Sequence, residues 1–254
     1  MQATAGRPAV FWSRELFGEA DRPNAGSPEP VLLAYLVNQA EAAVLSCIFM
    51  LEPQQISDML LPYLDGHPLA VDQLGVISTY IDLMLKWNRV INLTAIRQPD
   101  QVVRRHFGES LFAARHLLAP EAADSVIDLG SGAGFPGVVF KIFAPSIRLT
   151  LVESHGKKAI FLRELVRTLH LSDVQVVQER AEHLQERAAL ITFRAVEKFE
   201  SILCTSASLV APGGRVGALI GASQLTAAAS VLHGRWRSVA IPESKSRVLA
   251  IWQA

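Results

Sequence analysis

The segment from residue 128 to residue 137 carries the strongest chemical signal in the sequence. It reads Asp-Leu-Gly-Ser-Gly-Ala-Gly-Phe-Pro-Gly, follows a short apolar stretch over 125–129 and precedes a helical stretch. A glycine loop between a strand and a helix presents backbone N–H groups at the carboxyl edge of a sheet. Glycine is needed where φ is positive or where a ligand touches the backbone. The loop therefore predicts a ligand site.

Two ligands fit the spacing, in two registers. Gly132-x-Gly134-x-x-Gly137 matches the dinucleotide pattern. Asp128-x-Gly130-x-Gly132-x-Gly134 matches the loop that binds S-adenosylmethionine, in which the acidic residue faces the ammonium group of the ligand. Asp128 would repel a pyrophosphate, and Pro136 lacks the N–H that an anion needs at a helix start. These points favour S-adenosylmethionine as the cofactor and leave a nicotinamide dinucleotide as the alternative.

Two further acidic positions follow the next strands. Glu153 ends the stretch 148–153, where a carboxylate accepts both ribose hydroxyls in either register. Arg180-Ala181-Glu182 follows the stretch 174–178, where an adenine ring is expected. The alternatives are a solvated charge at Glu153 and, at Glu182, a first-turn acid stabilised by the dipole of its own helix.

The elements that must position these residues alternate between strand and helix. Short apolar stretches predict strands over 125–129, 148–153, 174–178, 189–193 and 215–220. Alternating strands and helices predict a doubly wound, Rossmann-like α/β fold with helices on both faces of a parallel sheet. Strands over 237–241 and 247–252 are too close for a crossover helix, so they must be antiparallel. Class I methyltransferases usually have such a terminal hairpin, whereas dinucleotide-binding domains usually lack it.

Three regions are expected along the chain. Residues 121–254 form the S-adenosylmethionine-binding domain, and residues 50–120 form a helical annex with an apolar stripe that includes Leu74, Ile77 and Ile81. Residues 1–49 are predicted to form a flexible leader with an additional helix beginning near Val31. The alternative is that the start codon was placed too early and that the protein begins at Met50.

Composition limits the class of protein. Half of the 254 residues are apolar, and 24 basic residues balance 24 acidic ones, which indicates a globular chain. Cys47 and Cys204 suit neither a disulfide framework nor a metal site, so no metal is expected. No stretch suits a membrane span, and a cytoplasmic protein is expected. Because the net charge is zero, any nucleic acid must be held by a local basic patch.

The sequence resembles the bacterial small-subunit rRNA guanine-N7 methyltransferases, also called glucose-inhibited division protein B, from about Met50 to its end. The glycine loop is common to many methyltransferases, whereas the other motifs are more specific. The resemblance rests on Leu85-Lys86-Trp87-Asn88, Ile91-Asn92-Leu93-Thr94, Arg97, Arg105-His106, Glu109-Ser110, Asp128 to Gly137, Glu153 to Lys158, Phe161-Leu162, Arg180-x-Glu182, Arg194-Ala195 and Ala211 to Arg215.

The resemblance implies a class I methyltransferase fold with an N-terminal helical annex and an enzyme that modifies N7 of a guanine in 16S rRNA, with naked RNA or the small ribosomal subunit as the substrate. A monomer is expected. Its implied cofactor site, added to the loop residues Asp128, Gly132 and Gly134, comprises Gly130, Phe135, Glu153, Ser154, His155, Ala181, Glu182 and Arg194. Guanine N7 carries a lone pair, so no catalytic base is expected, and Arg194 is expected to hold either the cofactor carboxylate or the guanine.

Basic residues near the carboxyl edge of the sheet are expected to contact RNA, although they also suit solvated helix faces. They are Arg104, Arg105 and His106 in the annex and Lys157 and Lys158 after Glu153. Trp87 is expected to pack the annex.

Three positions depart from the family pattern. Phe193 replaces a serine, Glu109 replaces an aspartate, and Ile220 replaces a lysine expected at the mouth of the site. The last change, with the zero net charge, keeps a small-molecule methyltransferase as a second alternative.

Overall fold

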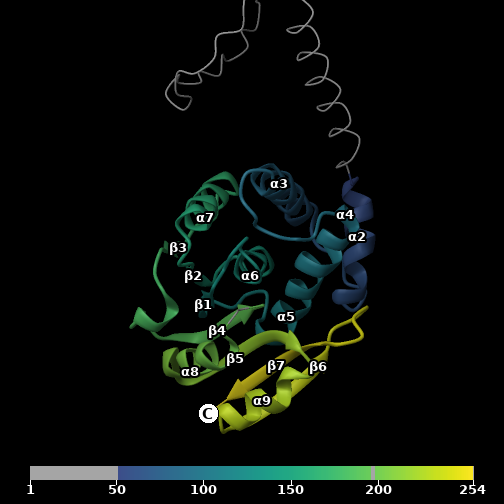
Figure 1. Ribbon diagram of the computed structural model, residues 1–254. Coiled ribbons are helices and arrows are strands. Elements are labelled where there is room, and N and C mark those ends of the chain that lie inside the picture. The colour runs from purple at the N-terminus through teal and green to yellow at the C-terminus, as the bar shows by residue number, and fades with distance from the viewer. Residues whose placement is uncertain (1–50, 196–197, 254) are drawn as a thin grey trace, which may run out of the picture. The chain divides into compact units, whose positions relative to one another are not determined.

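The computed structural model describes residues 51–195 and 198–253 (Figure 1). The leader expected over residues 1–49, its additional helix and the alternative start at Met50 lie outside the described residues. The helices are α2 (Pro53–Leu60), η1 (Leu61–Tyr63), α3 (Val71–Asn88), α4 (Pro99–Val102), the π-helix η2 (Val103–Gly108), α5 (Glu109–Leu117), α6 (Gly137–Phe143), α7 (Gly156–Thr168), η3 (Ala181–His183), α8 (Phe199–Leu209) and α9 (Gln224–Val231).

One seven-stranded sheet, in the order β3-β2-β1-β4-β5-β7-β6, forms the centre of the molecule. Its strands are β1 (Ser125–Leu129), β2 (Arg148–Val152), β3 (Val174–Val177), β4 (Ala188–Arg194), β5 (Val210–Gly221), β6 (Arg235–Ala240) and β7 (Arg247–Gln253). The first five pair in parallel, and β7 is antiparallel to both β5 and β6. The predicted sheet and its antiparallel terminal hairpin are therefore confirmed.

Strand β5 differs most from its predicted bounds. It begins at Val210 and not at residue 215, because Val210 pairs with Ala188 before the register shifts and Arg215 pairs with Leu190. The sequence Pro212-Gly213-Gly214 lies within this irregular part, with φ of 77° at Gly213. Because such a sequence is typical of a turn, the strand was predicted to begin only after it.

Successive residues of the central strands face two different hydrophobic cores. On β7, Leu249 and Ile251 pack in the core that α2, α3, α5, α6 and α7 share, whereas Ala250 and Trp252 pack in the core with α8 and α9. This alternation follows from the period of two along a strand. Figure 1 shows the two helical layers on opposite faces of the sheet.

The annex helices share their core with the sheet. Ile77 on α3 and Phe107 on η2 are fully buried in the same cluster as Val126 on β1. Trp87 packs the edge of its ring against Phe161 on α7, with ring centroids 5.8 Å apart, as predicted for a packing residue. Among the described residues, none of the helices combines the length and apolar character that a membrane crossing requires.

Candidate active site

The glycine loop connects β1 to α6 at the carboxyl edge of the sheet. Gly130, Gly132 and Gly134 have φ of 67°, 56° and 95°, in the region that L side chains rarely adopt. A Cβ on Gly134 would also lie 2.5 Å from the Tyr80 hydroxyl oxygen. Gly130 is exposed, so its backbone is open to a ligand. Positive φ at all three positions explains why the loop is rich in glycine.

Glu153 joins this loop to the end of β2. Its Oε2 accepts a hydrogen bond from the Gly132 N–H at 2.9 Å, and its Oε1 accepts one from the His155 N–H at 2.7 Å. The side chain is buried, while Ser154 and His155 beside it are exposed. A carboxylate has about four acceptor positions. Glu153 therefore fixes the loop and keeps acceptor capacity for the predicted ribose contact.

A pocket of about 280 Å³ opens beside the loop. Four of the predicted cofactor residues meet at its wall: Gly130, Ser154, Ala181 and Glu182. Val152, Glu179, Arg180, Lys198 and Ile202 complete the lining. Glu179, Lys198 and Ile202 were not predicted, because they belong to no motif. Glu179 follows β3 and directly precedes Arg180, whereas Lys198 and Ile202 reach the pocket through the packing of α8 beside the strand ends.

The structure corrects the orientation predicted for Asp128. The residue is fully buried, and its Oδ2 accepts a hydrogen bond from the Gly137 N–H at 3.1 Å. Its neighbours Ile127 and Leu129 point into the core beneath α8 and α9, so strand alternation directs Asp128 toward α6. Burial raises the pKa of this carboxyl to about 7. Asp128 therefore supports the start of α6 from below and does not face a ligand.

Phe135 is held in a stack of aromatic rings. The Tyr80 ring lies parallel to it with centroids 5.1 Å apart, and the His106 ring lies against it at 4.7 Å. Phe107 meets the edge of the same ring at 5.1 Å. The Tyr80 hydroxyl donates a hydrogen bond to the Ala133 carbonyl at 2.5 Å. Thus α3 and η2 support the glycine loop, and the side chain of Phe135 is part of that support.

The prediction that His106 contacts RNA is wrong. Its ring is buried against Phe135, and burial and nearby arginines lower its pKa to about 3, so it is neutral at pH 7. Its Nε2 forms a 2.8 Å hydrogen bond with the Thr94 hydroxyl. The Asn88 side-chain oxygen accepts from the N–H groups of Leu93 and Thr94, each at 2.9 Å. The motif residues of the annex therefore form a partly buried chain of contacts that ends at the glycine loop.

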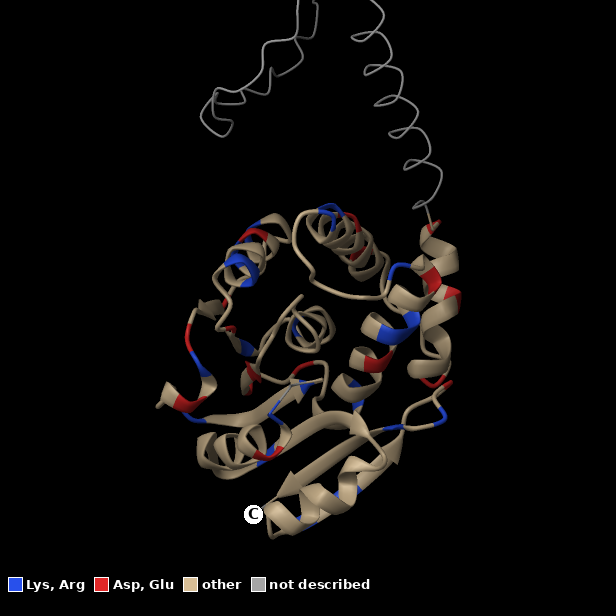
Figure 2. Cartoon of the chain, viewed as in Figure 1, with Lys and Arg blue, Asp and Glu red and all other residues tan. Residues whose placement is uncertain are grey.

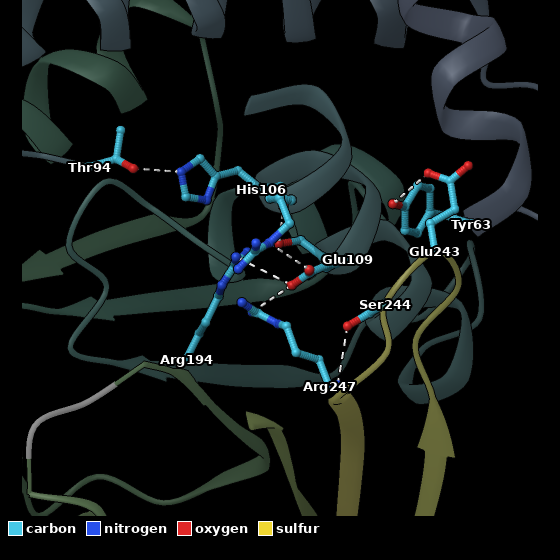
Figure 3. A network of polar contacts seen from close by, with 10 residues as sticks. Tyr63, Thr94, His106, Glu109, Arg194, Glu243, Ser244 and Arg247 are labelled. Carbon is cyan, nitrogen blue, oxygen red and sulfur yellow. Dashed lines mark hydrogen bonds and ion pairs between the residues drawn. The ribbon is translucent and has the colours of Figure 1, made fainter. Parts of the chain in front are cut away.

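Glu109 contacts three arginines, of which Arg194 and Arg247 are labelled beside it in Figure 3. Its carboxylate is 3.2 Å from Arg105 Nε, 3.3 Å from Arg194 Nη2 and 2.6 Å from Arg247 Nη2. Burial lowers the pKa of Arg194 to about 10, which leaves its guanidinium charged at pH 7. Arg194, predicted to hold the cofactor carboxylate or the guanine, is thus engaged with Glu109 in this structure. Sequence reasoning missed Arg247, which belongs to no motif.

The other basic residues predicted to contact RNA lie nearer the surface. Arg104 forms a 2.5 Å ion pair with Glu243 in the β6–β7 connection, and the Tyr63 hydroxyl also donates to Glu243 at 3.2 Å. Lys157 is exposed and Lys158 is half-buried in the first turn of α7. Figure 2 shows that this helix carries both basic and acidic residues.

Two departures from the family pattern prove to be core positions. Phe193 is fully buried and packs against Phe199 with ring centroids 6.5 Å apart. Ile220 pairs with Val248 across the β5–β7 ladder and is buried in the core with α8 and α9. The expectation that position 220 lies at the mouth of the site is therefore wrong, because its side chain is only 5% exposed and is enclosed by the residues of that core.

Comparison with known proteins places this chain among relatives that share one name. The family model described as rRNA small subunit methyltransferase G matches residues 73–233. The chain is 37% identical over 171 residues to ribosomal RNA small subunit methyltransferase G of Xanthomonas campestris pv. campestris (strain B100), covering 66% of this chain and 79% of that protein. It is 44% identical over 158 residues to the protein of the same name from Xylella fastidiosa (strain M23), covering 61% and 73%.

A solved structure supports the fold alone. The ribosomal protein L11 methylase from Lactobacillus delbrueckii subsp. bulgaricus superimposes with a TM-score of 0.51 at 13% identity, over 59% of this chain and 78% of that one. The sheet order and this likeness confirm the predicted class I methyltransferase fold. With the family match over residues 73–233, they lead to one conclusion: the chain belongs to the rRNA small subunit methyltransferase G family.

Proposed function

We propose that this protein transfers the methyl group of S-adenosylmethionine to N7 of a guanine in small-subunit rRNA. The observation that carries the choice of cofactor is the hydrogen bond from the Gly137 N–H to Asp128, at 3.1 Å. Because the preceding Pro136 has no N–H, this bond removes the donors that a diphosphate needs at the start of α6. A dinucleotide is therefore disfavoured relative to S-adenosylmethionine, a nucleoside ligand that carries no phosphate group.

Residues that line the pocket, and Glu153 between the lining residues Val152 and Ser154, fit the parts of that cofactor. Glu153 retains acceptor positions for ribose hydroxyls, and the exposed backbone at Gly130 lets a nucleoside approach closely. The half-buried Ala181 and the exposed Glu182 line the part of the pocket that suits adenine. When bound, S-adenosylmethionine supplies a methyl group activated by its sulfonium centre.

The demands on the protein are mainly geometric. Guanine N7 attacks the methyl carbon with its own lone pair, the carbon–sulfur bonding pair stays on sulfur, and the positive charge moves to the purine. No proton is removed beforehand, so the chain needs no general base. Its task is to align the two reactants, which is worth several orders of magnitude in rate. The stacked rings under Phe135 suit that task because they fix the glycine loop.

Two measurements test this function. Calorimetry should show binding of S-adenosylhomocysteine and none of NAD. Incubation with S-adenosylmethionine and either naked 16S rRNA or small subunits should then yield N7-methylguanosine at one nucleotide. Binding of NAD alone would refute the cofactor, and methylation of small molecules without rRNA would establish the small-molecule alternative. Gel filtration checks the monomer, and cell fractionation checks the cytoplasmic location.

We expect Lys157 and Lys158 to contact RNA phosphates. Reversing both charges with Lys157→Glu and Lys158→Glu should weaken rRNA binding and reduce its salt dependence, with unchanged affinity for S-adenosylhomocysteine. Reversal of the exposed Arg235 and Arg237 on β6 is the matched control. Equal rRNA affinity for the Lys157/Lys158 variant and the parent protein would remove α7 from the RNA surface.

A further inference from the structure

The arginines around Glu109 come from three distant parts of the chain. Arg105 lies on η2, Arg194 ends β4, and Arg247 begins β7. Arg247 pairs with Gly221 at the end of β5, so it lies at the same edge of the sheet as Arg194. That edge is also where the glycine loop leaves β1. The cluster is therefore next to the place where methyl transfer is proposed.

The charges of this cluster do not balance. One carboxylate, only 1% exposed, faces three guanidinium groups, which leaves two positive charges uncompensated. Arg194 is 7% exposed, and its Nη1, like Arg247 Nε, is buried without a hydrogen-bond partner among the described residues. Surplus charge of one sign is unfavourable away from water unless a counter-charge binds. The arrangement thus suits an anion that arrives from outside.

The exposure of the three arginines indicates where that anion can reach. Arg105 and Arg247 are 43% and 20% exposed, whereas Arg194 lies beneath them. The neighbouring Arg104 is already neutralised by Glu243 at 2.5 Å. The accessible surplus charge is therefore at Arg105 and Arg247, on the rim of the site. Guanidinium groups are well suited to phosphate because they donate two parallel hydrogen bonds.

We propose that Arg247 and Arg105 form a phosphate subsite that holds a phosphodiester of the RNA beside the guanine to be methylated. Glu109 is the positioning residue, since its carboxylate holds both guanidiniums while leaving donors free. The proposal rests on the proposed function and specifies how its substrate is placed. It assigns to Arg247 a role in RNA binding and none in holding the adenosine part of the cofactor, whose pocket is lined by other residues.

The test compares Arg247→Gln with Arg215→Gln. Arg215 is a matched control because it is 27% exposed, forms an ion pair with Asp124 and lies toward the opposite end of β5. Methylation of 16S rRNA by the parent protein is measured first, so failure of the proposed function is recognised separately. Binding of 16S rRNA is then titrated over a range of salt concentrations for each variant, together with binding of S-adenosylhomocysteine and thermal unfolding.

Arg247→Gln should weaken rRNA binding by about tenfold to hundredfold, as expected for loss of a charged hydrogen bond. It should also lower the slope of log affinity against log salt by about 0.7 to 0.9. Affinity for S-adenosylhomocysteine should not change, Arg247→Lys should restore the salt slope, and Arg215→Gln should match the parent. An unchanged slope in a folded Arg247→Gln protein overturns the proposal. Loss of S-adenosylhomocysteine affinity instead would also overturn it, because the anion would then be the cofactor carboxylate.

Discussion

Replacing Asp128 with asparagine tests whether this residue supports the start of α6 from the core or contacts the ligand. Asparagine has nearly the same shape, and its side-chain oxygen can still accept from the Gly137 N–H, which lies 3.1 Å from Oδ2 in the parent protein. The other carboxylate oxygen, Oδ1, is buried with no hydrogen-bond partner among the described residues, so an amide group there loses no hydrogen bond. The substitution removes a titrating group, and the cost of leaving the new amide N–H groups unpaired is the same at every pH, so it does not affect the pH dependence.

The size of the effect follows from the pKa. Burial raises the pKa of the Asp128 carboxyl from 3.8 to about 7, partly offset by the hydrogen bond from Gly137. Because the folded state binds this proton more tightly than the unfolded chain, its contribution to stability is complete below about pH 4 and is lost as pH rises through about 7. The full contribution is about 4 kcal/mol, of which about 3 kcal/mol disappears between about pH 5 and about pH 8.

The pH dependence of stability must be compared between the parent protein and Asp128→Asn, because His106 also titrates in the parent. Its pKa is lowered to about 3, so its contribution to stability is present above about pH 6.5 and is lost as pH falls. The two groups therefore act in opposite directions between about pH 5 and about pH 7, and the parent protein alone shows a flattened profile. The difference in unfolding free energy between the parent and Asp128→Asn isolates the carboxyl group.

The assay is urea unfolding of both proteins at several pH values from about 5 to about 8. The parent should lose about 3 kcal/mol relative to Asp128→Asn over that range. Affinity for S-adenosylhomocysteine, measured on the same samples at about pH 8, should change less than about threefold. Parallel stability profiles would refute the buried titration, and a large loss of affinity at about pH 8 would show that Asp128 faces the ligand after all.

Three other substitutions test the support of the loop. Gly134→Ala should abolish measurable binding of S-adenosylhomocysteine in calorimetry, because its Cβ would lie 2.5 Å from the Tyr80 hydroxyl oxygen at a φ of 95°. Glu153→Gln should weaken that binding by about tenfold or more, since the carboxylate fixes the Gly132 and His155 N–H groups. Phe107→Ala should lower the free energy of urea unfolding by about 3 to 5 kcal/mol, because the fully buried ring packs edge-on against Tyr80 and Phe135.

For each of these three substitutions, one result would contradict the prediction. Parent-like affinity in Gly134→Ala would mean that the loop adapts around the new methyl group. Unchanged affinity in Glu153→Gln would remove the carboxylate from the cofactor site. A loss below about 1 kcal/mol in Phe107→Ala would show that the aromatic stack can collapse onto the cavity without cost.

The sequence by itself determined the order of elements and the position of the ligand loop. Apolar stretches near 125–129 and 148–153 predict strands because a central strand is buried on both faces, and the short link between the last two strands excludes a crossover helix. The glycines at 130, 132 and 134 follow from a backbone that requires positive φ. These are local properties, so neighbouring residues are sufficient to specify them.

Only the tertiary structure decided what the charged and polar side chains do. Asp128 and His106 look like ligand-facing groups in the sequence, yet strand alternation buries the first and aromatic stacking buries the second. Glu109 acquires its three arginines from η2, β4 and β7, which meet only when the sheet forms. Burial and charge balance depend on residues that are far apart in the chain. For that reason, the contact of Arg247 with Glu109 could not be predicted from the sequence.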